Sequence, residues 1–236
     1  MTAAGTSARV GPAALAARLA TWAGTDRRRQ TRLAGRLREA VGRLAPGGRP
    51  PTRGATAEAW RCAVALAPRL HAAGAWRLPL RAAIDDETLA RLRREATRRQ
   101  PRGRSATTAY AAPGPHLRRL AVDPRLCAAI ADACGRAVCP AFTAVYMFDP
   151  PGAVVPPHLD TRAFPLVVHV VLTHERPAGL RGSALVVYEP ARTRRLHAAR
   201  GEALLLAGRG TVHRWTALHA RERRTMAAIG YRVVTR

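Results

Sequence analysis

The stretch from Tyr146 to Asp160 decides the fold and reads Tyr146-Met-Phe-Asp-Pro-Pro-Gly152-Ala-Val-Val-Pro-Pro-His158-Leu-Asp160. It joins an apolar segment to a turn rich in proline and glycine, and it ends in a His-x-Asp triplet. Side chains two residues apart in an extended chain project from the same face, so we expect His158 and Asp160 to hold one cation together. Alone, the triplet is a weak signal in a chain with 8 histidines.

A third candidate ligand lies farther along, in Thr211-Val-His213-Arg-Trp215, on a separate expected strand. Two histidines and one carboxylate on one side of a metal leave the other coordination positions open. That arrangement suits a non-haem Fe(II) that must also bind a co-substrate and O₂. We therefore predict a metal site formed by His158, Asp160 and His213.

The second half of the chain consists of short runs rich in valine and leucine, separated by turn residues. Several short strands at close spacing are typical of a β-sandwich or barrel. Strands are expected at residues 105–112, 141–148, 164–172, 183–188, 203–206, 211–214 and 225–234, with one helix at 123–138.

The first hundred residues are expected to be mainly helical. Apolar residues at helical spacing predict two amphipathic helices between residues 12 and 44, and the break near Gly24-Thr25-Asp26 is expected to supply the N-cap of the second. Further helices are expected at 56–71 and 85–98, and residues 46–54 read as a Pro/Gly linker. We therefore divide the chain into a helical region, 1–103, and a β-rich domain, 104–236.

The charge balance is unusual, because 40 basic residues face 15 acidic ones and the formal net charge is +25. Every basic residue is arginine, which suggests G/C-biased coding as much as selection for charge. Such a surface attracts anions in either case, so nucleic acid is not excluded as a partner. Aromatic content of 5% is low for base stacking.

Neither a secretory signal nor a long apolar run is visible, and we expect no membrane association and a cytoplasmic protein.

Four segments in order resemble the Fe(II)- and 2-oxoglutarate-dependent oxygenases, most of all the small prolyl-4-hydroxylase-type catalytic domain. They are residues 146–160, Gly182-Ser-Ala-Leu-Val-Val-Tyr-Glu-Pro190, Gly201-Glu-Ala-Leu-Leu-Leu206 with His213-Arg-Trp-Thr-Ala-Leu218, and Arg223-Arg-Thr225 before an apolar strand. The resemblance covers roughly residues 104–236. It implies an α+β fold whose core is a double-stranded β-helix of jelly-roll type, with the N-terminal helices packed on one sheet.

The resemblance also assigns roles to residues of this chain. The family's facial triad of metal ligands falls on His158, Asp160 and His213. The basic residue that anchors the distal carboxylate of 2-oxoglutarate falls on Arg223, with Thr225 matching a hydroxyl two positions later.

Two further residues are expected near the co-substrate. Tyr146 matches a strand that reaches 2-oxoglutarate in the family, and His169 has the same parity as Val167 and Val171, which we expect to face inward. Arg224 is an alternative to Arg223 for this role. Side chains alternate between the two faces of a strand, so Arg224 would face outward if Arg223 and Thr225 face inward.

The resemblance implies Fe(II) as metal and 2-oxoglutarate and O₂ as co-substrates. The expected reaction is hydroxylation of an unactivated C–H bond, with decarboxylation of 2-oxoglutarate to succinate. Because Asp160 fills the carboxylate position, halogenation is disfavoured. As substrate we expect an amino acid, a peptide or an intermediate tethered to a carrier protein, in natural-product biosynthesis, and the basic surface suits an anionic one.

Two other functions stay open on the sequence. A cupin-like metalloenzyme that does not use 2-oxoglutarate would be indifferent to the substitution Arg223→Ala. A nucleic-acid base demethylase or repair oxygenase would bind oligonucleotides tightly and with steep salt dependence.

Overall fold

The N-terminal third of the chain forms three helices in the computed structural model, which describes residues 10–102, 107–161 and 163–234. They are α1 (Pro12–Ala23), α2 (Arg27–Leu44) and α3 (Gly54–Leu70), and a short 3-10 turn, η1 (Pro46–Gly48), follows α2. The Asp26 carboxylate accepts hydrogen bonds from the backbone N–H groups of Arg28 and Arg29, so the predicted N-cap of α2 is confirmed. The helices expected between residues 12 and 71 are present.

The middle of the chain alternates short strands and helices. Its elements are β1 (Ala75–Leu78), α4 (Leu80–Ala83), α5 (Asp86–Arg99), β2 (Ala109–Ala111), α6 (Pro115–Ala121) and α7 (Pro124–Cys134). Of these, β1, α4 and α6 were not predicted. The boundary expected between residues 103 and 104 lies outside the described residues, but β1 pairs with a strand of the C-terminal half, so the region before the boundary contributes to the sheet.

Eight strands follow and complete two antiparallel sheets. They are β3 (Val138–Asp149), β4 (Val155–His158), β5 (Leu166–Glu175), β6 (Leu185–Tyr188), β7 (Thr193–Leu196), β8 (Ala203–Leu206), β9 (Val212–Trp215) and β10 (Arg223–Val233). The six-stranded sheet has the order β1-β8-β5-β10-β3-β2, and the four-stranded sheet has the order β4-β9-β6-β7. This is the expected jelly-roll α+β fold.

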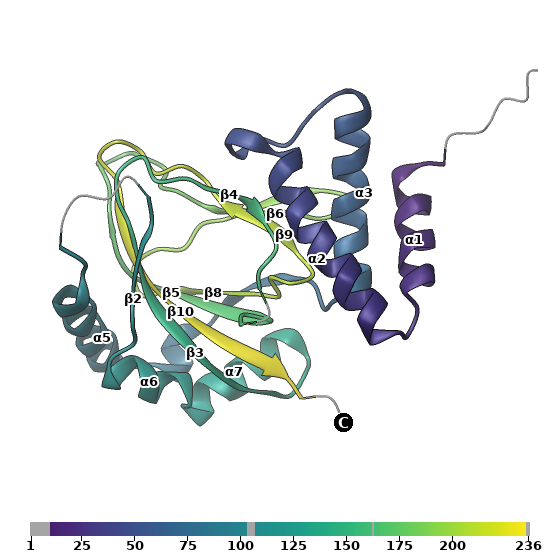
Figure 1. Cartoon of the computed structure of the whole chain (residues 1–236). Coiled ribbons are helices and arrows are strands. Elements are labelled where there is room, and N and C mark those ends of the chain that lie inside the picture. Colours follow the sequence, from purple (N-terminus) through teal and green to yellow (C-terminus); the bar gives the residue numbers. More distant parts are fainter. Residues whose placement is uncertain (1–9, 103–106, 162, 235–236) are drawn as a thin grey trace, which may run out of the picture.

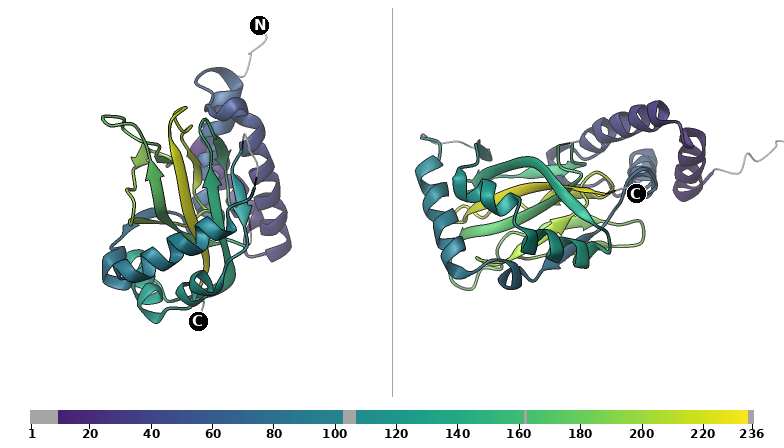
Figure 2. Two further views of the ribbon diagram at one scale, coloured as in Figure 1. Left: turned by 90° about the vertical axis from the view of Figure 1, so that its left-hand side faces the viewer. Right: turned by 90° about the horizontal axis from the view of Figure 1, so that it is seen from below.

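Helices cover the outer faces of both sheets (Figures 1 and 2). An outer core lies between the six-stranded sheet and α5, α6 and α7, and it buries Leu92, Leu117 and Ile130. A helical core joins α1, α2 and α3 to the four-stranded sheet. An inner core between the two sheets is lined by side chains such as Val167 and Leu185, and it is the space in which a site would lie. Among the described residues, no helix combines the length and apolar character needed to cross a membrane.

Candidate metal centre and its cavity

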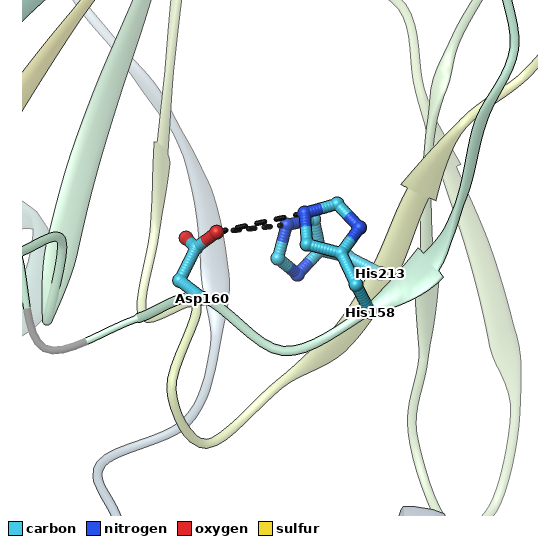
Figure 3. A group of neighbouring side chains, drawn as sticks. All are labelled: His158, Asp160 and His213. Carbon is cyan, nitrogen blue, oxygen red and sulfur yellow. Dashed lines mark ion pairs between the residues drawn. The ribbon is translucent and has the colours of Figure 1, made fainter. Parts of the chain in front are cut away.

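His158 and His213 face each other across the junction of two neighbouring strands. They occupy opposite positions in the β4–β9 register, with ring centroids 4.2 Å apart. Asp160 follows two residues after His158, and its backbone N–H donates to the Gly208 carbonyl at 2.9 Å, which fixes the chain as it leaves β4. The Nε2 atoms of His158 and His213 lie 3.5 and 3.6 Å from Asp160 Oδ1 (Figure 3).

Both imidazoles are oriented by the backbone. Nδ1 of His158 contacts the Pro156 carbonyl at 2.8 Å, and Nδ1 of His213 contacts the Thr211 carbonyl at 2.9 Å. A carbonyl only accepts hydrogen bonds, so each Nδ1 carries a proton, and Nε2 is the atom that presents a lone pair when the ring is neutral. Both lone pairs are therefore directed toward the Asp160 carboxylate, the arrangement that metal-binding histidines need.

Asp160 has the character of a metal ligand that lacks a protein partner. Its Oδ2 atom is buried and has no hydrogen-bond partner among the described residues, a costly situation for a carboxylate oxygen. Gly208 makes the close approach possible, because a Cβ at that position would lie 1.8 Å from Asp160 Oδ2. One ligand atom from each of His158, Asp160 and His213 lies within 4.8 Å of the others, so the residues fit a divalent cation.

Burial and charge set the protonation of the site. Burial lowers the pKa of His213 to about 3, with a smaller contribution from the neighbouring His158 ring, so His213 is neutral at physiological pH. Burial opposes the ionisation of Asp160, but the two imidazoles outweigh it and lower the pKa of the carboxyl. A neutral imidazole and an ionised carboxylate are the forms that bind metal.

A cavity of about 120 Å³ opens beside these three residues, between the two sheets. Most of its wall is apolar or aromatic, formed by Tyr110, Val145, Met147, Val155, Phe164, Val167, Trp215 and Ala228. The volume exceeds what one or two waters need and suits a small organic molecule. An apolar pocket with a few convergent polar groups is the usual form of a small-molecule site.

His169 also lines this cavity. Its ring packs edge-on against Trp215 with centroids 5.8 Å apart, and its Nδ1 is buried without a hydrogen-bond partner among the described residues. Burial lowers the pKa of His169 to about 4, so the ring is neutral. The predicted inward orientation of His169 is confirmed.

The arginine pair at the start of β10 has the opposite orientation to the one expected. Arg223 is exposed, whereas Arg224 is buried, with its guanidinium carbon 3.8 Å from the centroid of the Trp215 ring. Thr225 lies opposite Phe148, which belongs to the outer core, so Thr225 is on the wrong face as well. The expectation that Arg223 and Thr225 face the cavity is therefore wrong, because the inward parity of β10 falls on Arg224, Met226 and Ala228.

Arg224 is held by acidic and hydroxyl partners. Its Nε and Nη2 donate to Asp149 Oδ2 at 2.9 and 2.6 Å, and its Nη1 donates to Ser183 Oγ at 2.9 Å. These bonds use three of the five N–H donors of the guanidinium. Asp149 also accepts from the hydroxyl of Thr108 at 2.7 Å.

Tyr146 also points away from the cavity, contrary to expectation. Its hydroxyl donates to Glu95 Oε1 at 2.6 Å, inside the outer core. The neighbours Val145 and Met147 line the cavity instead. Tyr110, on the edge strand β2, and Trp215 were missed as cavity residues, although the position of Trp215 two residues after His213 places it on the same face of β9.

The comparison with solved structures identifies the fold. No protein-family model matches the sequence, and no curated protein matches it. Among solved structures, the α-ketoglutarate-dependent epimerase SnoN from nogalamycin biosynthesis is 20% identical, with a TM-score of 0.54 over 69% of this chain and 80% of that one. An oxidoreductase of the 2OG-Fe(II) oxygenase family from Burkholderia pseudomallei is 19% identical, with a TM-score of 0.54 over 67% of this chain and 84% of that one.

HygX from Streptomyces hygroscopicus, crystallised with nickel and 2-oxoglutarate, is 16% identical, with a TM-score of 0.51 over 67% of this chain and 82% of that one. The chain has the fold of the 2-oxoglutarate-dependent Fe(II) oxygenases. This oxygenase fold accounts for the two sheets and for a site between them. The arrangement that could hold a metal ion is formed by His158, Asp160 and His213.

Proposed function

We propose that the protein is an Fe(II)- and 2-oxoglutarate-dependent oxygenase that hydroxylates an unactivated C–H bond of a small molecule. The observation that supports this most strongly is the convergence of the Nε2 atoms of His158 and His213 on Asp160 Oδ1, with each Nδ1 bonded to a carbonyl. The fold shared with α-ketoglutarate-dependent enzymes supports the same assignment.

His158, Asp160 and His213 would hold Fe(II) on one side. Bound Fe(II) together with 2-oxoglutarate supplies the activated oxygen that such reactions need. The chain contributes orientation, because the carbonyl bonds keep both Nε2 lone pairs aligned before any metal arrives. Its apolar walls, including Val167 and Trp215, exclude water around the reacting groups.

His169 and Tyr110 are the polar side chains of the cavity that do not belong to the metal centre. We assign His169 as a hydrogen-bonding partner of the bound oxoacid, because its buried Nδ1 has no partner among the described residues. Tyr110 is 60% exposed and stands at the edge of the sheet, so we assign it to contact with the substrate at the cavity mouth.

Arg224, rather than its neighbour, is the residue we assign to the distal carboxylate of 2-oxoglutarate. It is buried against Trp215, which lines the cavity, and two of its N–H donors remain beyond the bonds to Asp149 and Ser183. A planar guanidinium with two adjacent donors can bind a carboxylate through two charge-assisted hydrogen bonds.

The substrate we favour is a natural-product intermediate, whether an amino acid, a peptide or a carrier-tethered group. One of the proteins with this fold, SnoN, acts in nogalamycin biosynthesis. The formal net charge of +25 favours an anionic substrate or an acidic carrier.

A second function has one specific observation in its favour. The charge of Arg224 is already matched by Asp149 in a buried pair, which reduces its attraction for another carboxylate. A metal-dependent enzyme that needs no oxoacid would use the same triad of ligands and leave this ion pair undisturbed.

One experiment separates the two functions. Fe(II) and then 2-oxoglutarate are added without oxygen to the purified protein, and the weak visible charge-transfer band of the Fe(II)–oxoacid chelate is measured. We expect a band in the wild type, no band in His158→Ala, and a requirement for far more 2-oxoglutarate in Arg224→Lys, which keeps the charge but loses the fork.

Arg223→Gln is the matched control, because this exposed neighbour carries the same charge. It should titrate like the wild type. Iron binding without a band at any 2-oxoglutarate concentration would favour the second function. An equal response of the Arg223 and Arg224 variants would remove Arg224 from the assignment while leaving the metal site in place.

A further inference from the structure

A second cavity, of about 180 Å³, lies between α2 and the turn that joins β8 to β9. It is distinct from the cavity between the sheets, yet both are lined by Asp160. A molecule that fills this second cavity therefore lies beside the residue that we assign to the metal.

The lining of the second cavity is cationic. Arg38 of α2 and Arg209 of the turn contribute guanidinium groups, and His71 contributes an imidazole. Asp160 is the sole acidic side chain among the described lining residues, and its charge is the one a bound metal would offset. A concave surface with charges of one sign concentrates ions of the opposite sign.

The two glycine neighbours of Arg209 let its segment approach the rest of the chain closely. A Cβ at Gly208 would lie 1.8 Å from Asp160 Oδ2, and a Cβ at Gly210 would lie 2.1 Å from the Ala72 carbonyl oxygen. The backbone of Arg209 is thus held between the metal-ligand segment and the end of α3. Its Nη2 donates to Nε2 of His71 at 3.1 Å, which sets the direction of the guanidinium.

The helix side of the cavity is kept open by small residues. Ala34 and Gly35 lie one turn from Thr31 and Arg38 on the same face of α2. A Cβ at Gly35 would meet no heavy atom within 4 Å, so a side chain there would enter open space. Glycine inside an 18-residue helix costs about 1 kcal/mol relative to alanine.

We propose that the second cavity binds the oxyanion of the substrate, a carboxylate or a phosphate monoester, between Arg38 and Arg209. An oxyanion held there lies beside the Asp160 segment, which both cavities share. The role of this site in binding a substrate rests on the proposed function, but anion binding itself can be tested separately.

The test measures binding of two probe anions, methyl phosphate and propionate, to the full-length chain by calorimetry at constant ionic strength. The protein is loaded with Zn²⁺, which offsets the charge of Asp160, and the arginine variants separate binding in the cavity from binding to the metal. We expect one saturable site, and the probe that binds more tightly identifies the oxyanion. Arg209→Gln and Arg38→Gln should each weaken binding at least about tenfold, the effect of one lost charge-assisted hydrogen bond.

Two matched controls separate this site from general attraction to a basic protein. Gly35→Leu should abolish binding by filling the cavity, whereas Gly42→Leu, at another open position of α2, should bind like the wild type. Both raise helix propensity, so loss of folding does not explain a difference. Arg36→Gln removes an exposed charge from the same helix and should change little. Equal binding by the Gly35 and Gly42 variants, or by the Arg209 and Arg36 variants, would overturn the proposal.

The Fe(II)–oxoacid band, measured in the same variants, distinguishes this inference from the proposed function. In one outcome the band forms in the wild type and in Gly35→Leu, and neither Gly35→Leu nor Arg209→Gln changes anion binding. That outcome refutes the anion site and leaves the oxygenase assignment standing. In the opposite outcome no band forms in the wild type, but the wild type binds the anion and Gly35→Leu does not. That outcome refutes the oxygenase assignment and leaves the anion site standing.

Discussion

The space between the two sheets and the outer core both contain buried polar side chains, but the surroundings of these side chains differ. In the cavity, Asp160 Oδ2 and His169 Nδ1 are buried without a partner among the described residues. In the outer core, the Tyr146 hydroxyl donates to Glu95, while the Tyr231 hydroxyl is buried there without a partner among the described residues. An unmatched buried polar atom is costly, and the unmatched atoms of Asp160 and His169 belong to residues that line a cavity, so a ligand can complete them there. The bond between Tyr146 and Glu95 serves internal stabilisation instead.

The largest expected effect is on stability, at the buried ion pair. Asp149→Asn leaves the Arg224 guanidinium buried without a counter-charge, which should lower the free energy of unfolding by about 3–5 kcal/mol in urea denaturation. The double variant Asp149→Leu with Arg224→Met should recover most of that loss, because apolar residues can replace a buried pair. A single variant as stable as the wild type would contradict the structural role.

Glu222 is a buried carboxylate whose hydrogen bonds should make the stability of the protein depend on pH. Burial disfavours its charge, but hydrogen bonds from the Ser183 and His219 N–H groups and from His174 outweigh this and lower its pKa from 4.5 to about 2. A lowered folded-state pKa contributes stability above pH 4.5 that is lost as pH falls toward 2, here about 3 kcal/mol. Denaturation measured from pH 7 to pH 2 should show this decline in the wild type.

The variant Glu222→Gln is the control for that decline. It should be less stable than the wild type at pH 7, and the difference between the two should shrink as pH falls through the same window. A constant difference at every pH would show that another carboxyl causes the decline.

The cavity side of the comparison is tested at Gly208. Gly208→Ala brings a methyl group against Asp160 Oδ2 and should displace the carboxylate, weakening metal affinity by about 10–100-fold in a chelator competition assay. Gly42→Ala, where a methyl group meets no neighbour, should leave metal affinity unchanged. Equal affinities in the two variants would mean that Asp160 does not depend on the close approach of the turn.

The smallest effect is expected at Tyr146. Tyr146→Phe removes one hydrogen bond to Glu95, whose carboxylate still accepts from the His116 and Leu117 N–H groups, so about 1 kcal/mol of stability should be lost. The affinity for 2-oxoglutarate should not change, since the side chain lies in the outer core. A loss of 2-oxoglutarate affinity would restore the family role expected from the sequence.

The sequence predicted side-chain positions correctly where a strand has one polar and one apolar face, or where a strand ends in a turn. His158, Asp160 and His213 were brought together as the two-residue spacing and the Pro/Gly turn predicted. The length of α2 and its cap were likewise visible in local chemistry, because Asp26 precedes a helical pattern.

The errors arose in strands that are buried on both faces. β3 and β10 are covered by helices outside and by the second sheet inside, so apolar residues occupy both faces and alternation gives no parity. Arg223 and Tyr146 were placed by their match to the family pattern, and alternation gave no signal that could correct their faces. A register irregularity between Thr225 and Met226 in the β10–β5 pairing lies at the same point, and no sequence signal announced it.

The two carbonyl bonds of the histidines have a consequence for the kinetics of metal uptake. Each ring is aligned by a carbonyl two residues earlier in its own segment, so the loss of side-chain freedom occurs when β4 and β9 pair. An ion entering the site then meets ligands that need no rearrangement, and little ordering entropy is lost on binding. Metal capture should follow a single fast phase at a rate proportional to metal concentration, with no slower step from a change of shape.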